Sequence, residues 1–431
     1  MTPDEETPRF RNMKEAKPTA QKSAGLRDLF ALERNIIVLA SSTFFLGCGE
    51  NLWAKFLPKY LQALGANIGL VGLFGTLQEF VDTIYQYPGG RLTDRIGRKK
   101  ALVLFTGISF GGYLLYLIAP HWLLIFIGLL FAMSLSLAQP AIFALIGDSL
   151  PREKRAMGFT IQSILKRLPL VIAPPIGGLL LGSYGIKGGV RVGLLASLAL
   201  TALAVFLQKR YYEETFASIK ESSKGKSAFV RWKALNPSLR SLLSADCLVR
   251  FGDRLVKIFV IFWVMDSIGA TAFQYGLLTG LQMAVSILSY IPIARMADRG
   301  SRLPFVALSF LFLPMFPLVL FFSKSFIWLI LAFLVAGLRE IGEPPRKALI
   351  VDLAPQEIRG EVVGIYYALR GFAAMPAAAI GGVIWSFKPQ AALLISIVIG
   401  LAGFFLLLTR VREPGEAVLV RRIFKGTIDG K

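Results

Sequence analysis

Residues 90–99 read Gly-Arg-Leu-Thr-Asp-Arg-Ile-Gly-Arg-Lys, and they lie between two long apolar runs. A degenerate copy, Ala-Arg-Met-Ala-Asp-Arg-Gly-Ser-Arg, occupies residues 294–302, so adding 204 to a residue number in the first copy gives a like residue in the second. Such an unbroken offset predicts an internal duplication. The same offset relates Pro140 to Pro344, Asp148 to Asp352, Arg155 to Arg359 and Gly177-Gly178 to Gly381-Gly382.

The composition is typical of a membrane protein. Of the 431 residues 55% are hydrophobic and 17% are charged, and the mean hydropathy is +0.60, which is too apolar for a soluble protein of this length. About 20 apolar residues in a helix cross a bilayer core about 30 Å thick. The chain has twelve such runs, continuously apolar rather than alternating, near residues 35–62, 68–89, 101–119, 122–147, 157–182, 190–208, 244–266, 271–294, 303–322, 326–350, 360–386 and 390–409.

The duplication and the apolar runs together predict the fold. We expect an all-α membrane protein with twelve transmembrane helices, arranged as two pseudo-symmetric six-helix bundles around a central cavity. The expected parts are a disordered cytoplasmic tail at 1–34, an amino-terminal bundle at 35–208, a cytoplasmic linker at 209–243, a carboxyl-terminal bundle at 244–409 and a cytoplasmic tail at 410–431.

The distribution of charge predicts the orientation. Of the 48 Lys and Arg residues, 33 lie in the two tails and the even-numbered connections, so both termini are expected to be cytoplasmic in a multi-pass protein of the cell membrane. Anionic lipid of the inner leaflet is then the expected partner of the basic loops, and nucleic acid is not. A single His and two Cys, all isolated, predict no metal site, no disulfide and no cofactor. The chain is expected to act as a monomer.

The stretch at 90–99 is similar to the signature loop of the major facilitator superfamily, which has a Gly, three residues, Asp-Arg, one residue, Gly and then basic residues. The resemblance covers about residues 35–410 and implies a secondary transporter with that family's fold. It also implies a conformational latch, in which Asp94 docks on a neighbouring helix start, where a carboxylate is favoured by about 0.3–1 kcal/mol. The expected latch residues are Gly90, Asp94, Arg95, Gly97, Arg98, Asp298 and Arg299.

Charged residues inside the spans indicate which helices face a cavity, because a charge facing lipid costs about 2.5–3.5 kcal/mol. The third, sixth, ninth and twelfth spans have no charge in their interiors and are expected at the periphery. Lys166 and Arg370 are related by the 204 offset, so we expect them to grip an anionic group from both halves; an acid on another helix, among Glu50, Glu340 and Glu343, is the alternative partner. The expected substrate-binding residues are Glu50, Lys166, Arg167, Arg254, Arg339, Glu340 and Arg370.

Three acidic residues are expected to couple transport to protons, because a carboxylate released from its partner in one state can take up a proton. Glu79 and Asp82 share a helix that has no basic residue of its own, and Glu343 is the third. Residues 173–178, Ala-Pro-Pro-Ile-Gly-Gly, are similar to a stretch that marks antiporters of the family, although alanine replaces the first glycine.

The predicted function is secondary transport of a small organic solute, anionic or zwitterionic, by alternating access with proton coupling, and export is favoured. An uptake symporter of an anionic solute and a non-transporting receptor or scaffold of the same fold are the alternatives. No catalytic constellation of His, Cys or Ser and no ATP-binding loop is found, so an enzyme or a primary pump is not expected.

Overall fold

The computed structural model describes residues 26–138, 152–212, 237–298, 301–354 and 359–412, and these are nearly all helical. In the described residues, each of the twelve expected spans carries helix. The first half has α1 (Leu26–Asn51), η1 (Ala54–Phe56), α2 (Leu57–Ala63), α3 (Ile68–Ile96), α4 (Arg98–Ile118), α5 (Trp122–Ala132) and α7 (Arg152–Tyr211). The second half has α8 (Pro237–Lys257), α9 (Val260–Phe262), η3 (Trp263–Ser267), α10 (Ala272–Asp298), α11 (Leu303–Phe322), α12 (Phe326–Leu338), η4 (Arg339–Gly342), α13 (Glu343–Leu353), α14 (Arg359–Ala374), α15 (Ala377–Phe387) and α16 (Pro389–Arg410).

Five helical segments of the described chain are long and apolar enough to cross a membrane by length and composition alone. Other expected spans are interrupted or carry more charge. The first breaks between α1 and η1, and the tenth changes from α12 to the short 3-10 helix η4 at Arg339. Breaks of this kind are tolerated at membrane depth where the backbone lines a cavity. The five segments are Arg98–Ile118, Lys166–Tyr211, Leu303–Phe322, Val362–Phe387 and Pro389–Arg410.

Two boundaries differ from the sequence prediction. α1 begins at Leu26, so residues 26–34 are helical rather than part of a disordered tail. The signature stretch is not a loop over most of its length, because α3 continues to Ile96 and only Gly97, at φ 88°, breaks the helix. Glycine adopts this positive φ without the steric cost that a side chain would add. The fifth and sixth spans are two helices, as expected; they share the label α7 and meet at Gly185, where φ is 70° and the backbone is not helical.

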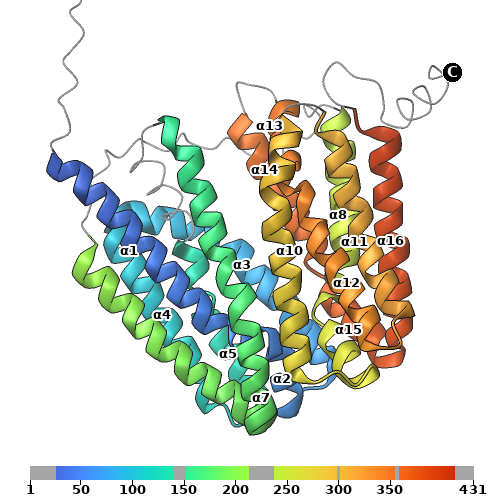
Figure 1. Cartoon of the computed structure of the whole chain (residues 1–431), viewed down its shortest axis with the longest axis horizontal. Coiled ribbons are helices and arrows are strands. Elements are labelled where there is room, and N and C mark those ends of the chain that lie inside the picture. Colours follow the sequence, from blue (N-terminus) through green and yellow to red (C-terminus); the bar gives the residue numbers. More distant parts are fainter. Residues whose placement is uncertain (1–25, 139–151, 213–236, 299–300, 355–358, 413–431) are drawn as a thin grey trace, which may run out of the picture.

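The two halves lie side by side, the first half in blue to green and the second in yellow to red (Figure 1). We call the end at which α16 terminates the upper end, and the end that holds α2 and the bend of α7 the lower end, as they appear in the figure. The halves diverge towards the upper end. At the lower end α3 packs against α15, and α7 packs against α10.

These two helix contacts depend on glycines without side chains. A Cβ atom at Gly72 in α3 would lie 2.5 Å from the carbonyl oxygen of Ala378 and 2.9 Å from the Cα of Gly382 in α15. Gly276 in α10 approaches the backbone of α7 in the same way, and Gly178 in α7 approaches the backbone at the start of α10. Gly276 follows Gly72 by 204 residues, and Gly382 follows Gly178 by 204, so the two contacts are copies of each other. We call these four residues the glycine seam.

Candidate functional site

A central cavity of about 390 Å³ lies between the two halves. Its walls come from α1, η1, α2 and α3 of the first half and from α8, α9, α10, α12, η4 and α15 of the second. Phe316 of α11 also lines the cavity. The ninth span was expected to lie at the periphery, and this is wrong for the part that holds Phe316. The polar residues of its walls are Glu50, Asn51, Lys55, Gln78, Glu79, Asp82, Arg254, Lys257, Tyr275, Thr279, Gln282 and Arg339.

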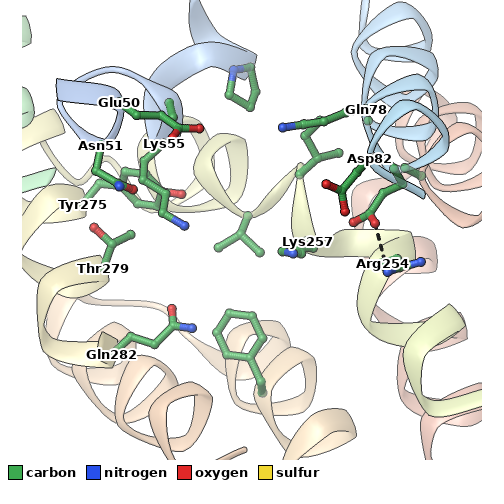
Figure 2. A pocket seen from close by; sticks show the side chains of 18 of the residues that line it. Glu50, Asn51, Lys55, Gln78, Asp82, Arg254, Lys257, Tyr275, Thr279 and Gln282 are labelled. Carbon is green, nitrogen blue, oxygen red and sulfur yellow. Dashed lines mark ion pairs between the residues drawn. The ribbon is translucent and has the colours of Figure 1, made fainter. Parts of the chain in front are cut away.

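Two lysines from opposite halves reach into this cavity. Lys55 of η1 and Lys257 at the end of α8 approach the same space from different sides (Figure 2). Neither makes a hydrogen bond or an ion pair with any residue in the described part of the chain. Lys257 repels Lys55, and Glu50 attracts it. The cavity therefore presents two cationic groups that form no ion pair with a residue in the described ranges.

The two arginines of the cavity are paired. Arg254 Nη2 lies 2.9 Å from Glu79 Oε2, a contact that joins α8 to α3 across the two halves (Figure 2). Arg339 Nη1 donates to Asp253 Oδ1 at 2.7 Å within the second half. Glu79 was expected to couple protons because its own expected span has no basic residue. Its ion-pair partner lies on a helix of the other half, which the sequence of its own helix does not reveal.

The acidic side of the cavity is formed by Glu50 and Asp82. Asp82 Oδ1 accepts a 2.5 Å hydrogen bond from the hydroxyl of Ser136. Glu50 has no ion pair with a residue that the structure describes, although Lys166 and Lys55 are the cations that attract it most. These acids lie towards the first half, whereas Lys257 and Arg254 lie on the second, so the cavity is polarised between the halves.

Neutral hydrogen-bonding groups complete the wall. Gln78 and Gln282, which are related by the 204 offset, both line the cavity, and Thr279 and Tyr275 lie beside Gln282 (Figure 2). Amide and hydroxyl groups can orient a polar solute without adding charge. The sequence prediction did not include these residues because neutral polar side chains, unlike charged ones, do not mark a cavity-facing helix. The 204 offset that relates Gln78 to Gln282 is the signal in the sequence that could have identified this pair.

Arg167, Glu340 and Glu343 lie together in a second contact between the halves. Arg167 of α7 donates through Nη1 to Ser286 Oγ of α10 at 2.6 Å, and its Nη2 lies 3.4 Å from Glu343 Oε2 and 3.9 Å from Glu340 Oε2. Glu343 also pairs with Lys347 at 2.8 Å. Arg167 is thus a bridge between the halves in this conformation.

Lys166 and Arg370, which were expected to grip one anionic group from both halves, do not line a common cavity in the described chain. Arg370 Nη1 lies 3.5 Å from Asp246 Oδ2, and its guanidinium stacks on Tyr367 at 4.7 Å. Asp246 is 0% exposed and also accepts from Arg346 and Tyr366, both at 2.9 Å. Arg370 therefore belongs to a buried ionic cluster within the second half. Its partner is Asp246 and not one of the expected alternatives, Glu50, Glu340 and Glu343.

Several of the expected latch residues lie outside the part of the chain that the structure describes. They are the side chains of Asp94 and Asp298, the surroundings of Gly90 and the whole of Arg299. Arg95 is exposed in the last turn of α3, and Arg98 begins α4 directly after Gly97.

A short ion pair joins the halves at the lower end. Lys59 of α2 is 7% exposed, and its Nζ donates to both carboxylate oxygens of Asp266 in η3, at 2.5 and 2.6 Å. The ammonium group also lies 4.9 Å from the ring centre of Phe262. The glycine seam and this pair hold the lower end closed. Both residues were missed because each lies near the expected end of its span.

Comparisons with known proteins agree with this architecture. The model of a family described as Major Facilitator Superfamily matches residues 39–245 and 242–425. A multi-drug resistance efflux pump PmrA homolog of Lactococcus lactis is 26% identical over 394 residues, which are 82% of this chain and 94% of the relative. A Na(+), Li(+), K(+)/H(+) antiporter of Planococcus maritimus is 28% identical over 200 residues, 45% of each chain. The crystal structure of a mutant nucleoside transporter, NupG, superposes with a TM-score of 0.72 at 12% identity, over 88% of this chain and all of that one.

Proposed function

Since the chain belongs to the major facilitator superfamily, we propose that it moves a small anionic or zwitterionic organic solute through the central cavity by alternating access. The family consists of multi-pass membrane transporters and not of enzymes. In alternating access the two halves rock about a site between them, which opens to one side of the membrane at a time.

The observation that carries the proposal on the solute is the pair Lys55 and Lys257. An unpaired ammonium group at membrane depth is costly, so it is stabilised by water or by an anion. Because Lys55 belongs to the first half and Lys257 to the second, an anionic group between them is bound best when the halves are close. Rocking then changes the distance between the two cations and with it the affinity for the solute.

Proton coupling is proposed to act through Glu79. Its ion pair with Arg254 spans the two halves, so movement of the halves separates the two groups. A carboxylate that loses its arginine partner becomes available for a proton, which links protonation to conformation. The similarity to an antiporter that exchanges cations for protons supports coupling of this kind.

Export is the favoured direction, in a cell membrane with both termini cytoplasmic. One relative that matches over most of the chain is named an efflux pump. With that orientation the closed lower end faces outward, and the cavity receives solute from the cytoplasmic side. Asp94 and the other latch residues are proposed to control the equilibrium of conformations without contacting the solute.

Flux into proteoliposomes tests the proposal. Labelled organic anions, zwitterions and cations are offered with and without a pH gradient, to the wild type and to Lys55→Gln, Lys257→Gln and the control Lys388→Gln, whose lysine is exposed outside the cavity. Each cavity variant is expected to weaken the binding of a transported anion by about 1.5–3 kcal/mol, the range for a hydrogen bond to a charged group. The control should match the wild type. Equal affinity in all four proteins would refute an anion site at these lysines.

A second variant tests the coupling. Glu79→Gln is expected to abolish accumulation driven by a pH gradient while exchange of labelled for unlabelled solute continues, because exchange needs no net proton movement. Persistence of pH-driven accumulation would assign the coupling to another group.

A further inference from the structure

A second cavity of about 420 Å³ opens beside the central one, and all of its described lining residues belong to the first half. The two cavities share Glu50, Asn51, Asp82 and Met133, so they meet at one end. Leu39 and Glu50, both in the wall, are eleven residues apart on α1, which corresponds to a length of about 16 Å at 1.5 Å per residue. The second cavity is therefore elongated, and it runs from the centre of the molecule along α1 towards the upper end.

The wall of this cavity combines an apolar part with polar groups. Five leucine side chains from α1, α4, α7 and the segment after α5 form the core of the apolar part, and the polar lining residues are Thr43, Glu50, Asn51, Asp82, Ser136, Lys166 and Gln208. Lys166 and Glu50 lie near the end shared with the central cavity, where Lys166 attracts Glu50 without forming an ion pair. Gln208, from the last turns of α7, also lines the wall. The leucines are Leu39, Leu46, Leu102, Leu135 and Leu170.

Gln208 is the observation that points to an occupant. The residue is 0% exposed, yet neither its amide nitrogen nor its amide oxygen has a hydrogen-bond partner among the residues that the structure describes. A buried polar group left without a partner costs about 1–3 kcal/mol, and such groups are rare in native structures. Lys166, which is exposed to the cavity, likewise makes no hydrogen bond or ion pair to a residue within the described ranges. The cavity thus presents the Glu50 carboxylate, the Lys166 ammonium group and the Gln208 amide, each without an ion pair or side-chain hydrogen bond to a described residue.

We propose that the second cavity binds a zwitterion with a long apolar body, such as an α-amino acid with an extended side chain. The ammonium group of the ligand faces Glu50 and its carboxylate faces Lys166, so each charge of the ligand meets its opposite. The apolar body lies along the leucines, and a hydrogen-bonding group towards its far end pairs with Gln208. Glu50 and Lys166 carry opposite charges and lie near one another without forming an ion pair, so a zwitterionic head group can be bound between them.

This site differs from the solute site proposed for the central cavity. Its described wall comes from one half only, so rocking of the halves need not dismantle it, and it does not depend on Lys55 or Lys257. The proposal therefore stands or falls separately from the anion site. A ligand held here lies beside Glu50 and has a direct path into the central cavity.

Three fluorescent probes test the head group. Nε-dansyl-lysine has a free ammonium group and a free carboxylate, dansylcadaverine lacks the carboxylate, and Nα-acetyl-Nε-dansyl-lysine lacks the ammonium charge. Binding is measured by the rise in dansyl fluorescence with the protein in lipid nanodiscs. Lys166→Gln is expected to weaken Nε-dansyl-lysine about 10–100-fold and to leave dansylcadaverine unchanged. Glu50→Gln should weaken dansylcadaverine by a similar factor and leave the acetylated probe unchanged.

Gln208→Met tests the far end and controls for misfolding. Methionine fills a similar volume without hydrogen-bonding groups, so the ligand-free protein should unfold at a higher temperature while Nε-dansyl-lysine binds more weakly. Damage to the fold would lower both quantities together, and that result, or unchanged binding, would overturn the role of Gln208.

Lys257→Gln locates the probe, because this lysine lines the central cavity and not the second one. Binding unchanged in Lys257→Gln and weakened in Lys166→Gln supports the proposal. The reverse pattern would place the probe in the central cavity and overturn it, as would the absence of binding to the wild type. Neither result would bear on the flux experiment, which uses other solutes and reports on Lys55 and Lys257.

Discussion

The glycine seam allows the smallest possible perturbation of the conformational equilibrium, which is the addition of one methyl group. In Gly72→Ala the new Cβ atom would lie 2.5 Å from the Ala378 carbonyl oxygen and 2.9 Å from the Gly382 Cα. Ordinary van der Waals contact begins at 3.4 Å, so the two helices must separate by several tenths of an ångström or more. The obstruction exists only while α3 and α15 are in contact, so the variant disfavours the closed lower end and not the fold of either half.

The magnitude follows from the cost of overpacking. Extra atoms in a well-packed contact cost about 1–3 kcal/mol. A difference of this size between two conformations changes their ratio about 5–150-fold. Alanine is also favoured over glycine in a helix by about 1 kcal/mol, which stabilises the helix in both conformations and therefore cancels from the ratio. Gly276→Ala, the equivalent change at the other contact, should act in the same direction.

Distances between spin labels measure the effect. Lys187→Cys and Lys388→Cys place one label on each half near the lower end, both at exposed positions, after Cys48 and Cys247 are replaced by serine. Gly72→Ala is expected to increase the population with a long distance between the labels. Gly107→Ala is the matched control, because its new Cβ has nothing within 4 Å. A distance distribution in Gly72→Ala identical to that of the control would refute the role of the seam.

Three further outcomes are expected. Lys59→Gln or Asp266→Asn should destabilise the closed lower end by about 1 kcal/mol; the effect is small because Asp266 is 51% exposed and water screens the ion pair. Exchanging the two residues should restore closure in the same distance measurement. Arg346→Met should lower thermal stability by about 3–5 kcal/mol because Asp246 is left buried without its main partner, and an unchanged melting temperature would contradict this. Asp94→Asn should slow transport at nearly unchanged solute affinity; wild-type turnover would remove Asp94 from the latch.

The arrangement of helices could be predicted from the sequence because it depends on quantities that the sequence carries directly. The length of an apolar run sets whether it crosses the bilayer, and the 204 offset relates the halves without further information. The failures are local. The helical start at Leu26 and the continuation of α3 to Ile96 occur where polar residues extend a helix beyond the apolar run. Hydropathy measures the membrane segment and not the helix.

The site could be predicted only in part, because depth along a helix is encoded in the sequence while rotation about its axis is not. Lys166 and Arg370 have the same depth by symmetry, yet Lys166 lines a cavity in the first half and Arg370 turns towards Asp246 within the second. Glu79 illustrates the complementary failure, since its arginine partner lies on a helix from the other half. Pairing across helices is decided by packing, and only a structure supplies it.

The duplication explains why the halves share a scaffold but not a chemistry. Gly72 and Gly276 are identical residues at copied positions, and each serves the same kind of close helix contact. Glu50 and Arg254 occupy copied positions as well, yet one is acidic and the other basic, and both line the central cavity. A symmetric scaffold lets the two open conformations have similar energies, which rapid interconversion requires. Opposite charges at copied positions give the cavity a polarity that a symmetric site would lack, and this polarity allows a solute with a charged end to be bound in one orientation.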